Sequence, residues 1–415
     1  MDASTSMPAA PGRSFADVWM ITFGHAMTHW YPATFYVLLP LIGKELGLSY
    51  SQIGLVMTCQ YIAGAVSNVP GGMLADTTGR KGLLMALSLF WIGFPYLLIG
   101  FSHSYAALLL CVSLVGIGNN LWHPTAIPLL GHRYPERKGL VLSLHGMGGN
   151  VGDALAPLAV GALLAVFTWR EIVVMNAVPG AVAACAILAY MGSLRLAGKK
   201  KRQPAPEADG QSLGEYAQGL RALARSRLLI LLAVSSAFRS MTQTTLLTFL
   251  PVFLAYHMHY SPLWIGACMF LLQAAGFLAA PVAGHLSDRM GRKRIVMSSM
   301  VLSGLMLAGM AFAGRSPAFV FFIALVGFFL YAIRPVLQAW LLDATPKNMG
   351  GTGIGVLFGM QAVGSSIGPL LGGVVADRHG IMATFWLLAG IIVLANLFIF
   401  LIPATGAKAS GAAPG

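Results

Sequence analysis

A small set of ionisable residues stands inside long apolar runs of this sequence, where each charge is costly. The set consists of His25, His29, His123, His145, Asp153, Arg239 and Arg334. If the runs cross a membrane, each such residue costs roughly 2.5–3.5 kcal/mol on insertion scales and is a functional candidate by default. Imidazoles and a buried carboxyl group exchange protons near neutral pH, whereas arginine stays charged and binds anions. The residue types therefore predict anion binding combined with proton transfer.

Four pairs of polar residues in these runs share a spacing of four positions, which places both members of a pair on one helix face. The pairs are His25 with His29, Asn119 with His123, Arg239 with Gln243, and Arg334 with Gln338. A single pair of this kind also serves to join neighbouring helices, but four of them favour a common site. We predict that these eight residues bind the substrate, because planar guanidinium groups fit a carboxylate, phosphate or phosphonate.

Proton coupling requires a group that changes its charge near neutral pH. The predicted proton carriers are Asp153, His29 and His123, because a buried carboxyl group and an imidazole both titrate in that range. Asn150 stands one turn before Asp153 on the same face, within reach of a hydrogen bond to it. The alternative is that Asp153 only pairs with an arginine or a histidine and holds helices together. His145 has the weakest claim to the site, since it stands close to the cytoplasmic end of its run.

Composition identifies the solvent of these runs as a lipid bilayer. The 415 residues are 57% hydrophobic and only 9% charged, against about 25% charged residues in a soluble domain. In a soluble protein, an excess of 26 Lys and Arg over 13 Asp and Glu would suggest nucleic-acid binding. So few charges cannot cover a water-facing surface, and no nucleic-acid partner is expected. The first residues are polar and small, without the pattern of a signal peptide.

Twelve apolar runs are long enough for a helix to cross the hydrocarbon, which takes about 20 residues. They lie at 17–42, 51–74, 82–101, 104–131, 138–166, 170–193, 228–256, 262–286, 294–313, 317–343, 350–375 and 381–403. These runs are too long for barrel strands and show no alternation of polar and apolar residues. The sequence therefore predicts an all-α membrane protein with twelve transmembrane helices.

The stretch 195–227 divides the runs into six and six. It holds the basic cluster Lys199–Arg202 and then apolar residues at helical spacing, namely Leu213, Tyr216, Leu220 and Leu223. This pattern predicts a linker with a short amphipathic helix on the membrane surface. The predicted domains are a six-helix bundle at 1–194, the linker at 195–227 and a second bundle at 228–415. Lysine and arginine gather in the loops of one side, which predicts that both termini are cytoplasmic.

The two halves of the chain repeat one another. The set Gly72, Asp76, Gly79, Arg80 and Lys81 recurs 212 positions later as Gly284, Asp288, Gly291, Arg292 and Lys293. By the same offset, Gly152, Pro157 and Gly161 recur as Gly364, Pro369 and Gly373. Such duplication is typical of transporters built from two pseudo-symmetric bundles, with the substrate site near the membrane midplane between them.

Over essentially its full length the chain resembles a major facilitator superfamily transporter, because the family's loop pattern Gly-x3-Asp-x2-Gly-Arg-Lys/Arg appears in both repeated sets. The resemblance implies that these loops latch one conformational state, with Asp76 and Asp288 at positive helix ends and not on the substrate. It also implies that the helices with the four polar pairs line a central cavity. The glycines of the fifth and eleventh runs are implied to pack helices closely, namely Gly148, Gly149, Gly152, Gly364, Gly368 and Gly372.

Within the superfamily, three patches are most like the fosmidomycin-resistance branch. They are Gly24-His25, the segment from Val115 to Pro124, and the segment from Gly148 to Gly152. The chain departs from that branch at Thr28-His29, where an acidic residue is expected. It also has Val112 where drug–proton antiporters carry an arginine, and the antiporter signature is intact only in the eleventh run. The resemblance implies a monomer in the bacterial plasma membrane, without a cofactor.

The preferred functional hypothesis is proton-coupled export of a small anionic or zwitterionic compound, such as a phosphonate antibiotic. The alternative is proton-coupled uptake of an organic anion, since the residues do not set the direction. Metalloid export would require converging thiolates, whereas Cys59, Cys111, Cys185 and Cys268 share no motif, and no metal site is predicted. A membrane enzyme using His123 or His29 with Asp153 is disfavoured, because an enzyme gains nothing from a duplicated latch.

Overall fold

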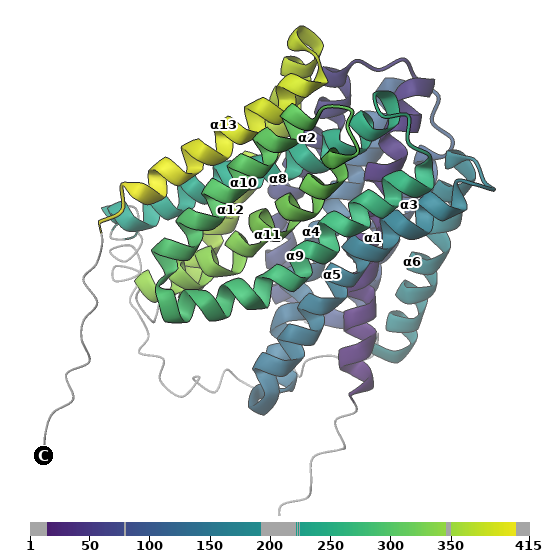
Figure 1. Cartoon of the computed structure of the whole chain (residues 1–415). Helices are drawn as coiled ribbons and strands as arrows, with labels where there is room; N and C mark the ends of the chain where they lie inside the picture. The colour runs from purple at the N-terminus through teal and green to yellow at the C-terminus, as the bar shows by residue number, and fades with distance from the viewer. Residues whose placement is uncertain are drawn as a thin grey trace, which may run out of the picture. The chain divides into compact units, whose positions relative to one another are not determined.

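The computed structural model describes residues 15–78, 80–191, 221, 223, 225–345 and 350–403. All regular elements in this part of the chain are helices, and twelve of them are long (Figure 1). In chain order they are α1 Ala16–Glu45, α2 Tyr50–Thr78, α3 Lys81–Ile99, α4 Tyr105–Arg133, α5 Lys138–Leu163, α6 Trp169–Met191, α8 Arg227–Tyr256, α9 Pro262–Met290, α10 Arg292–Ala313, α11 Ala318–Ala344, α12 Gly350–His379 and α13 Ile381–Phe400. Each long helix coincides with one predicted apolar run, so the predicted all-α architecture is confirmed.

Eight of these helices are long and apolar enough to cross a membrane by length and composition alone, namely α3, α4, α6 and α9 to α13. The other four long helices, α1, α2, α5 and α8, are of similar length but fall outside that limit of composition. Three of the four carry residues predicted for the site: the histidines of α1, Asp153 of α5 and Arg239 of α8. The helices α4 and α11 also hold predicted site residues and still qualify, so those residues alone do not account for the difference.

Local signals in the sequence set several helix ends. Ser104, Ser226 and Ser261 precede α4, α8 and α9, and each hydroxyl accepts a hydrogen bond from the backbone N–H three residues later. Such a cap satisfies one of the unpaired N–H groups of the first turn. Gly291 separates α9 from α10 with a φ of 92°, a conformation that glycine adopts without strain. This glycine of the second loop motif is therefore required by the turn.

By their contacts the described residues form two compact units. The first unit holds residues 15–38 and 63–191, and the second holds residues 39–62 and those from 221 onward. In the first, α3 packs on α4 and α6, and in the second, α10 packs on α11 and α13. Helices that correspond in the sequence repeat thus have corresponding neighbours. The domain limits at 194 and 228 stay a prediction, since most of the linker lies outside the described residues.

Glycines bring α5 onto α1 in the first unit and α12 onto α8 in the second. A Cβ atom added to Gly152 would lie 2.2 Å from the carbonyl oxygen of Ala26, and one added to Gly364 would lie 2.0 Å from that of Ala237. Gly148 similarly faces the carbonyl oxygen of Thr22. Real Cβ atoms do not approach other heavy atoms so closely. Glycine is therefore what lets these backbones touch, and the touching positions repeat between the two units.

Replacement of Gly152 by alanine is expected to destabilise the protein by about 1–3 kcal/mol, the usual cost of forcing extra atoms into a packed interior. The new methyl group would push α5 away from the backbone of α1, and the rigid carbonyl cannot yield. The measurement is the midpoint of thermal unfolding of the purified protein in detergent.

The matched control for Gly152→Ala is Gly146→Ala on the same helix. A Cβ atom at Gly146 meets nothing within 4 Å, and alanine is the better helix former by about 1 kcal/mol. The control is expected to unfold at the wild-type temperature or above it. Equal midpoints for both variants would show that the close approach of α1 and α5 contributes nothing to stability.

Candidate functional site

Five polar residues from three helices of the first unit meet in one place. We call His25, His29, His123, His145 and Asp153 the histidine cluster. On α1, the rings of His25 and His29 lie one turn apart and meet edge to face, with centroids 4.7 Å apart. From α4, the ring of His123 lies 5.0 Å from that of His25, and α5 supplies His145 and Asp153. The fold thus brings together four residues predicted for the site, His25, His29, His123 and Asp153. It adds His145, for which the sequence gave the weakest case.

Hydrogen bonds fix the orientation of the two imidazoles on α1. His25 donates from Nδ1 to the backbone carbonyl of His145 over 2.6 Å, and its Nε2 lies 3.1 Å from Nε2 of His123. His29 pairs through Nδ1 with Oδ2 of Asp153 at 2.9 Å. The side chains of His29 and Asp153 are 28% and 29% exposed, respectively, so this pair remains open to solvent. A partly accessible imidazole–carboxylate pair can accept and release a proton.

His145 belongs to the cluster and packs on its central ring, that of His25, although the sequence analysis gave it the weakest claim. Its ring stacks on that of His25 with centroids 3.9 Å apart, and the side chain is buried. Neither ring nitrogen has a hydrogen-bond partner among the described residues. The position was underrated because distance from the end of a helix is a poor guide to depth once helices tilt and pack. Its helical phase was the better signal: His145, Gly149 and Gly152 share one face.

Gly149 leaves the space that the imidazoles occupy. A Cβ atom at this position would lie 2.8 Å from Cε1 of His25 and 3.0 Å from Nε2 of His29. Asn150, one possible partner of Asp153, is exposed, and Asp153 pairs with His29 instead. The close contact of α1 and α5 therefore builds the cluster and selects its pairing.

The second unit carries the predicted arginines. Arg239 on α8 is only 2% exposed, and its Nη1 donates to Oε1 of Gln243, one turn later, over 2.7 Å. Its Nε has no hydrogen-bond partner in the described part of the chain. Arg334 on α11 is exposed and close enough to repel the charge of Arg239. Two neighbouring positive charges of this kind favour an anion between them.

The remaining predicted ligands lie on the same helices. Asn119 is half-buried one turn before His123, and its Oδ1 lacks a hydrogen-bond partner among the described residues. Gln338 is half-buried one turn after Arg334. The predicted polar residues thus form one group in each unit. That both groups share one substrate remains a prediction.

The second copy of the loop motif forms an ion-pair network. The guanidinium group of Arg292 pairs with Asp288 at 2.5 Å and with Asp343 of α11 at 3.2 Å, and it also donates to the hydroxyl of Ser287. Gly284 has open space where a side chain would point. Asp288 therefore lies in a network that joins the α9–α10 turn to α11. Asp288 and Arg239 lie on different helices, and the role of Asp288 as a latch stays a prediction.

The first copy of the loop motif is described in part. Lys81 is buried and donates from Nζ to the carbonyl of Ala75 over 2.6 Å, which ties the start of α3 to the end of α2. Arg80 is exposed, and Gly72 has open space around it. Gly79 and the side chain of Asp76 lie outside the described residues. The latch roles of this copy stay a prediction.

One buried acid was missed by the sequence analysis. Asp17 in the first turn of α1 is 1% exposed and pairs with Arg133 at the end of α4 at 2.5 Å. The hydroxyl of Tyr134 also donates to Asp17, and burial, followed by the Asp17 carboxylate, raises the pKa of Tyr134. The available signal was an acid in the first turn of α1 and a base in the last turn of α4, each at the helix end where its charge is favourable.

A second acid missed by the sequence analysis lies in the second unit. Asp377 near the end of α12 accepts the backbone N–H groups of Tyr50 and Ser51, at 2.8 and 2.9 Å. These are among the unpaired N–H groups at the start of α2, and the positive end of the helix favours the carboxylate. No spacing rule in the sequence connects residues that lie more than 300 positions apart. Asp377 therefore had no sequence signal.

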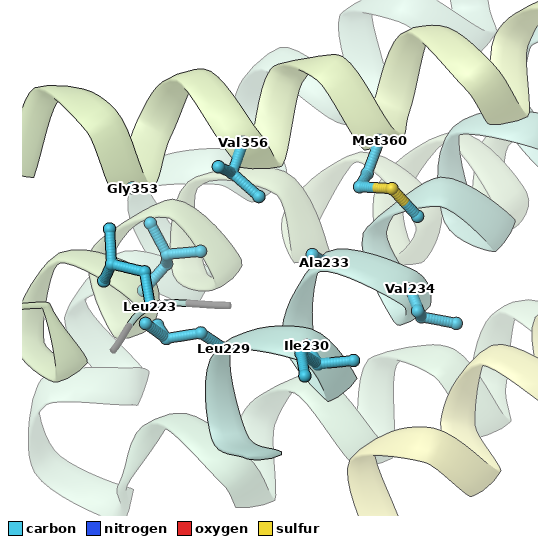
Figure 2. Close-up of a pocket in the computed structure, with 9 residues that line it drawn as sticks. Leu223, Leu229, Ile230, Ala233, Val234, Gly353, Val356 and Met360 are labelled. Carbon is cyan, nitrogen blue, oxygen red and sulfur yellow. The ribbon is translucent and has the colours of Figure 1, made fainter. Parts of the chain in front are cut away.

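The described residues that line a cavity of about 250 Å³ in the second unit offer no side chain that binds an anion. Figure 2 shows its lining from α8 and α12, with Leu223 at the edge of the linker. All nine lining residues are apolar or glycine, namely Leu223, Leu229, Ile230, Ala233, Val234, Leu341, Gly353, Val356 and Met360. Of the apolar residues predicted for the amphipathic linker helix, Leu223 is described and buried, while the other three lie outside the described residues. Neither Arg239 nor Gln243 is among the residues that line this cavity.

Comparison with known families identifies the fold. The sequence profile of the Major Facilitator Superfamily matches residues 18–279 and, in a second match, residues 232–415. The chain belongs to the Major Facilitator Superfamily. Members of this superfamily are secondary transporters of small molecules, so the chain is a multi-pass membrane transporter and not an enzyme.

Individual relatives are distant but cover nearly the whole chain. The fosmidomycin resistance protein of Escherichia coli (strain K12) is 23% identical over 391 residues, covering 94% of this chain and 93% of the relative. The probable sulfoacetate transporter SauU of Cupriavidus necator is 28% identical over 392 residues, covering 88% of each. The predicted resemblance to the superfamily, and within it to a fosmidomycin resistance protein, is therefore confirmed.

Solved structures agree on the fold. A bacterial homologue of the human lysosomal transporter Spinster, crystallised in an inward-facing and unoccupied conformation, superposes with a TM-score of 0.80. The two chains are 16% identical, and the match covers 94% of this chain and 97% of that one. At this identity the likeness establishes the major facilitator fold alone.

Proposed function

We propose that this transporter exports a small anionic or zwitterionic compound in exchange for protons, by alternating access. The observation that carries the proposal is Arg239, a buried guanidinium group whose Nε lacks a partner among the described residues and whose neighbours are Gln243 and a second arginine. A buried charge of this kind is costly unless a partner neutralises it. A substrate carboxylate, phosphate or phosphonate would supply that partner.

Relatives support the anionic character of the substrate. One is named for resistance to fosmidomycin and another for transport of sulfoacetate, which is an organic anion. The first name supports export of a toxic compound, and the second keeps uptake of an organic anion as the alternative. In our proposal Arg239, Gln243, Arg334 and Gln338 bind the anion, together with the imidazoles and Asn119 of the first unit.

Proton exchange is assigned to the pair of His29 and Asp153. The carboxylate and the imidazole lie 2.9 Å apart and are partly exposed, so a proton can reach them and change the charge of the pair. His123 lies beside them, with its ring 6.3 Å from that of His29. We further propose a monomer in the bacterial inner membrane, as the family resemblance implies. The distribution of lysine and arginine supports the proposal that both termini lie in the cytoplasm.

The test uses proteoliposomes that enclose a pH-sensitive dye, with equal pH on both sides and the membrane potential clamped. Phosphonates, organic acids and lipophilic cations are added outside one at a time. Inward movement of a substrate makes the lumen alkaline in an antiporter and acidic in a symporter, whichever way the protein is inserted. Empty liposomes correct for passive entry of weak acids.

Each outcome of this assay has a defined meaning. An alkaline shift with phosphonates or organic acids is expected and supports export, because the inward proton gradient of a cell then drives the substrate out. An acidic shift would establish uptake instead. A response to lipophilic cations alone would overturn the anion site and make Arg239 a structural residue.

A further inference from the structure

Three imidazoles from two helices converge within the histidine cluster. One ring nitrogen from each of His25, His29 and His123 lies within 4.8 Å of the others. His25 and His29 come from α1 and His123 comes from α4, so the convergence is produced by the fold and not by a short motif. Histidine is the commonest metal ligand among side chains, and three imidazoles form the ligand set of many zinc sites with one open position.

The tautomers of the inner imidazoles are those that a metal requires. A carbonyl oxygen only accepts, so His25 carries its proton on Nδ1, which donates to the carbonyl of His145 at 2.6 Å. The Nε2 of His25 therefore presents a lone pair toward His123. In the same way the Asp153 carboxylate accepts from Nδ1 of His29 at 2.9 Å, which leaves a lone pair on its Nε2. Outer hydrogen bonds to carbonyls and carboxylates are the usual support of metal-bound histidines.

The spacing of the closest pair fits a bound ion. Two nitrogens that bind one tetrahedral ion at 2.0–2.1 Å lie about 3.3 Å apart, and Nε2 of His25 lies 3.1 Å from Nε2 of His123. The wider limit of 4.8 Å for the whole group means that His29 would have to move closer on binding. Gly149, which lies beside Nε2 of His29, has no side chain to block this movement. The side chain of His29 is partly exposed, so its ring has room to move.

We propose that His25, His29 and His123 bind one divalent first-row transition-metal ion, such as Zn²⁺ or Co²⁺. His25 and His123 are the two ligands that already lie close together, and His29 is the third. The carbonyl of His145 and the carboxylate of Asp153 accept hydrogen bonds from Nδ1 of His25 and of His29, respectively. Imidazole ligands select this class of ions, whereas Mg²⁺ and Ca²⁺ require oxygen ligands. Three protein ligands leave a fourth position for water or an anionic donor.

This site differs from the metalloid exporter considered from the sequence, which would have needed thiolates. It also does not depend on the direction of transport or on the arginine group of the second unit. The competing explanation is a direct N–H···N hydrogen bond between His25 and His123, with the proton on Nε2 of His123 and no ion. That explanation predicts no stoichiometric binding of metal.

The experiment measures metal binding to the full chain, purified in detergent through a tag without histidine and stripped by a chelator. Zn²⁺ and Co²⁺ are titrated in competition with a chromophoric chelator, and the visible absorption of Co²⁺ reports its coordination. One equivalent is expected for the wild type. His25→Ala and His123→Ala are expected to weaken binding at least 100-fold, and Asp153→Asn about 10–100-fold, as for other outer partners of metal-bound histidines.

The control is His285→Ala, an exposed histidine on α9 in the second unit, which is expected to bind like the wild type. Absence of stoichiometric binding by the wild type would overturn the proposal, whatever the variants do. Equal binding by His25→Ala, His123→Ala and His285→Ala would overturn it as well. No substrate or gradient is present, so a failure here is separate from a failure of proton-coupled export.

Discussion

Replacement of Arg239 by glutamine is expected to lower the transport efficiency, kcat/KM, for an anionic substrate at least about 30-fold. A buried, hydrogen-bonded charge pair is worth about 2–5 kcal/mol when one partner is removed, and each 1.4 kcal/mol is tenfold. Glutamine keeps hydrogen-bonding capacity but not the charge or the planar fork. The measurement is initial uptake of the labelled substrate into proteoliposomes as a function of its concentration.

Two further variants make the Arg239 prediction specific. Arg239→Lys keeps the charge without the two-pronged geometry and is expected to lie between the wild type and Arg239→Gln. Arg315→Gln removes an exposed arginine after α10 in the same unit and is expected to transport normally. Normal transport by well-folded Arg239→Gln would exclude the guanidinium group as the anion ligand.

Replacement of Asp153 by asparagine is expected to separate substrate movement from proton movement. Asparagine still hydrogen-bonds His29 but brings no negative charge to stabilise a proton bound on the imidazole, so the pair no longer holds the proton that coupling requires. Accumulation driven by a pH gradient is expected to fall to the level of empty liposomes. Exchange of labelled for unlabelled substrate at equal pH needs no net proton movement and is expected to continue at a rate within a few-fold of the wild type.

The control for Asp153→Asn is Asn150→Ala, one turn earlier on α5 at an exposed position, which is expected to keep both activities. Gradient-driven accumulation by Asp153→Asn would remove the carboxylate from the proton route. Equal loss of accumulation and exchange would instead mark the Asp153–His29 pair as a bond that only holds α5 to α1. The melting temperature of the variant distinguishes that structural role from a loss of substrate binding, because only the structural role lowers it.

Much of the candidate site was predictable because its signals are local. His25 and His29 are one turn apart, as are Arg239 and Gln243, and a helix brings such pairs together wherever it lies. The contact between Arg239 and Gln243 follows from that geometry. The helices themselves followed from the length of the apolar runs, since a chain in lipid satisfies its backbone hydrogen bonds internally.

The pairing across helices could not be predicted in this way. Asn150 was one possible partner of Asp153 and an arginine or a histidine was the alternative, but nothing in the sequence singled out His29, 124 positions away. His145 was set aside for its place near a helix end, and it stacks on His25. Both outcomes depend on how closely and at what angle α5 lies against α1, which is decided by backbone contacts at Gly148 and Gly152.

The sequence by itself determined the class of this protein: its helices, its repeat and the kinds of charge in its interior. These properties depend on the periodicity and composition of single segments, which are fixed before any helices meet. Only the tertiary structure decided that three imidazoles from α1 and α4 face one another, and that Asp377 caps α2. The physical reason is that hydrogen bonds and metal ligands need ångström precision, and the packing of whole helices supplies it.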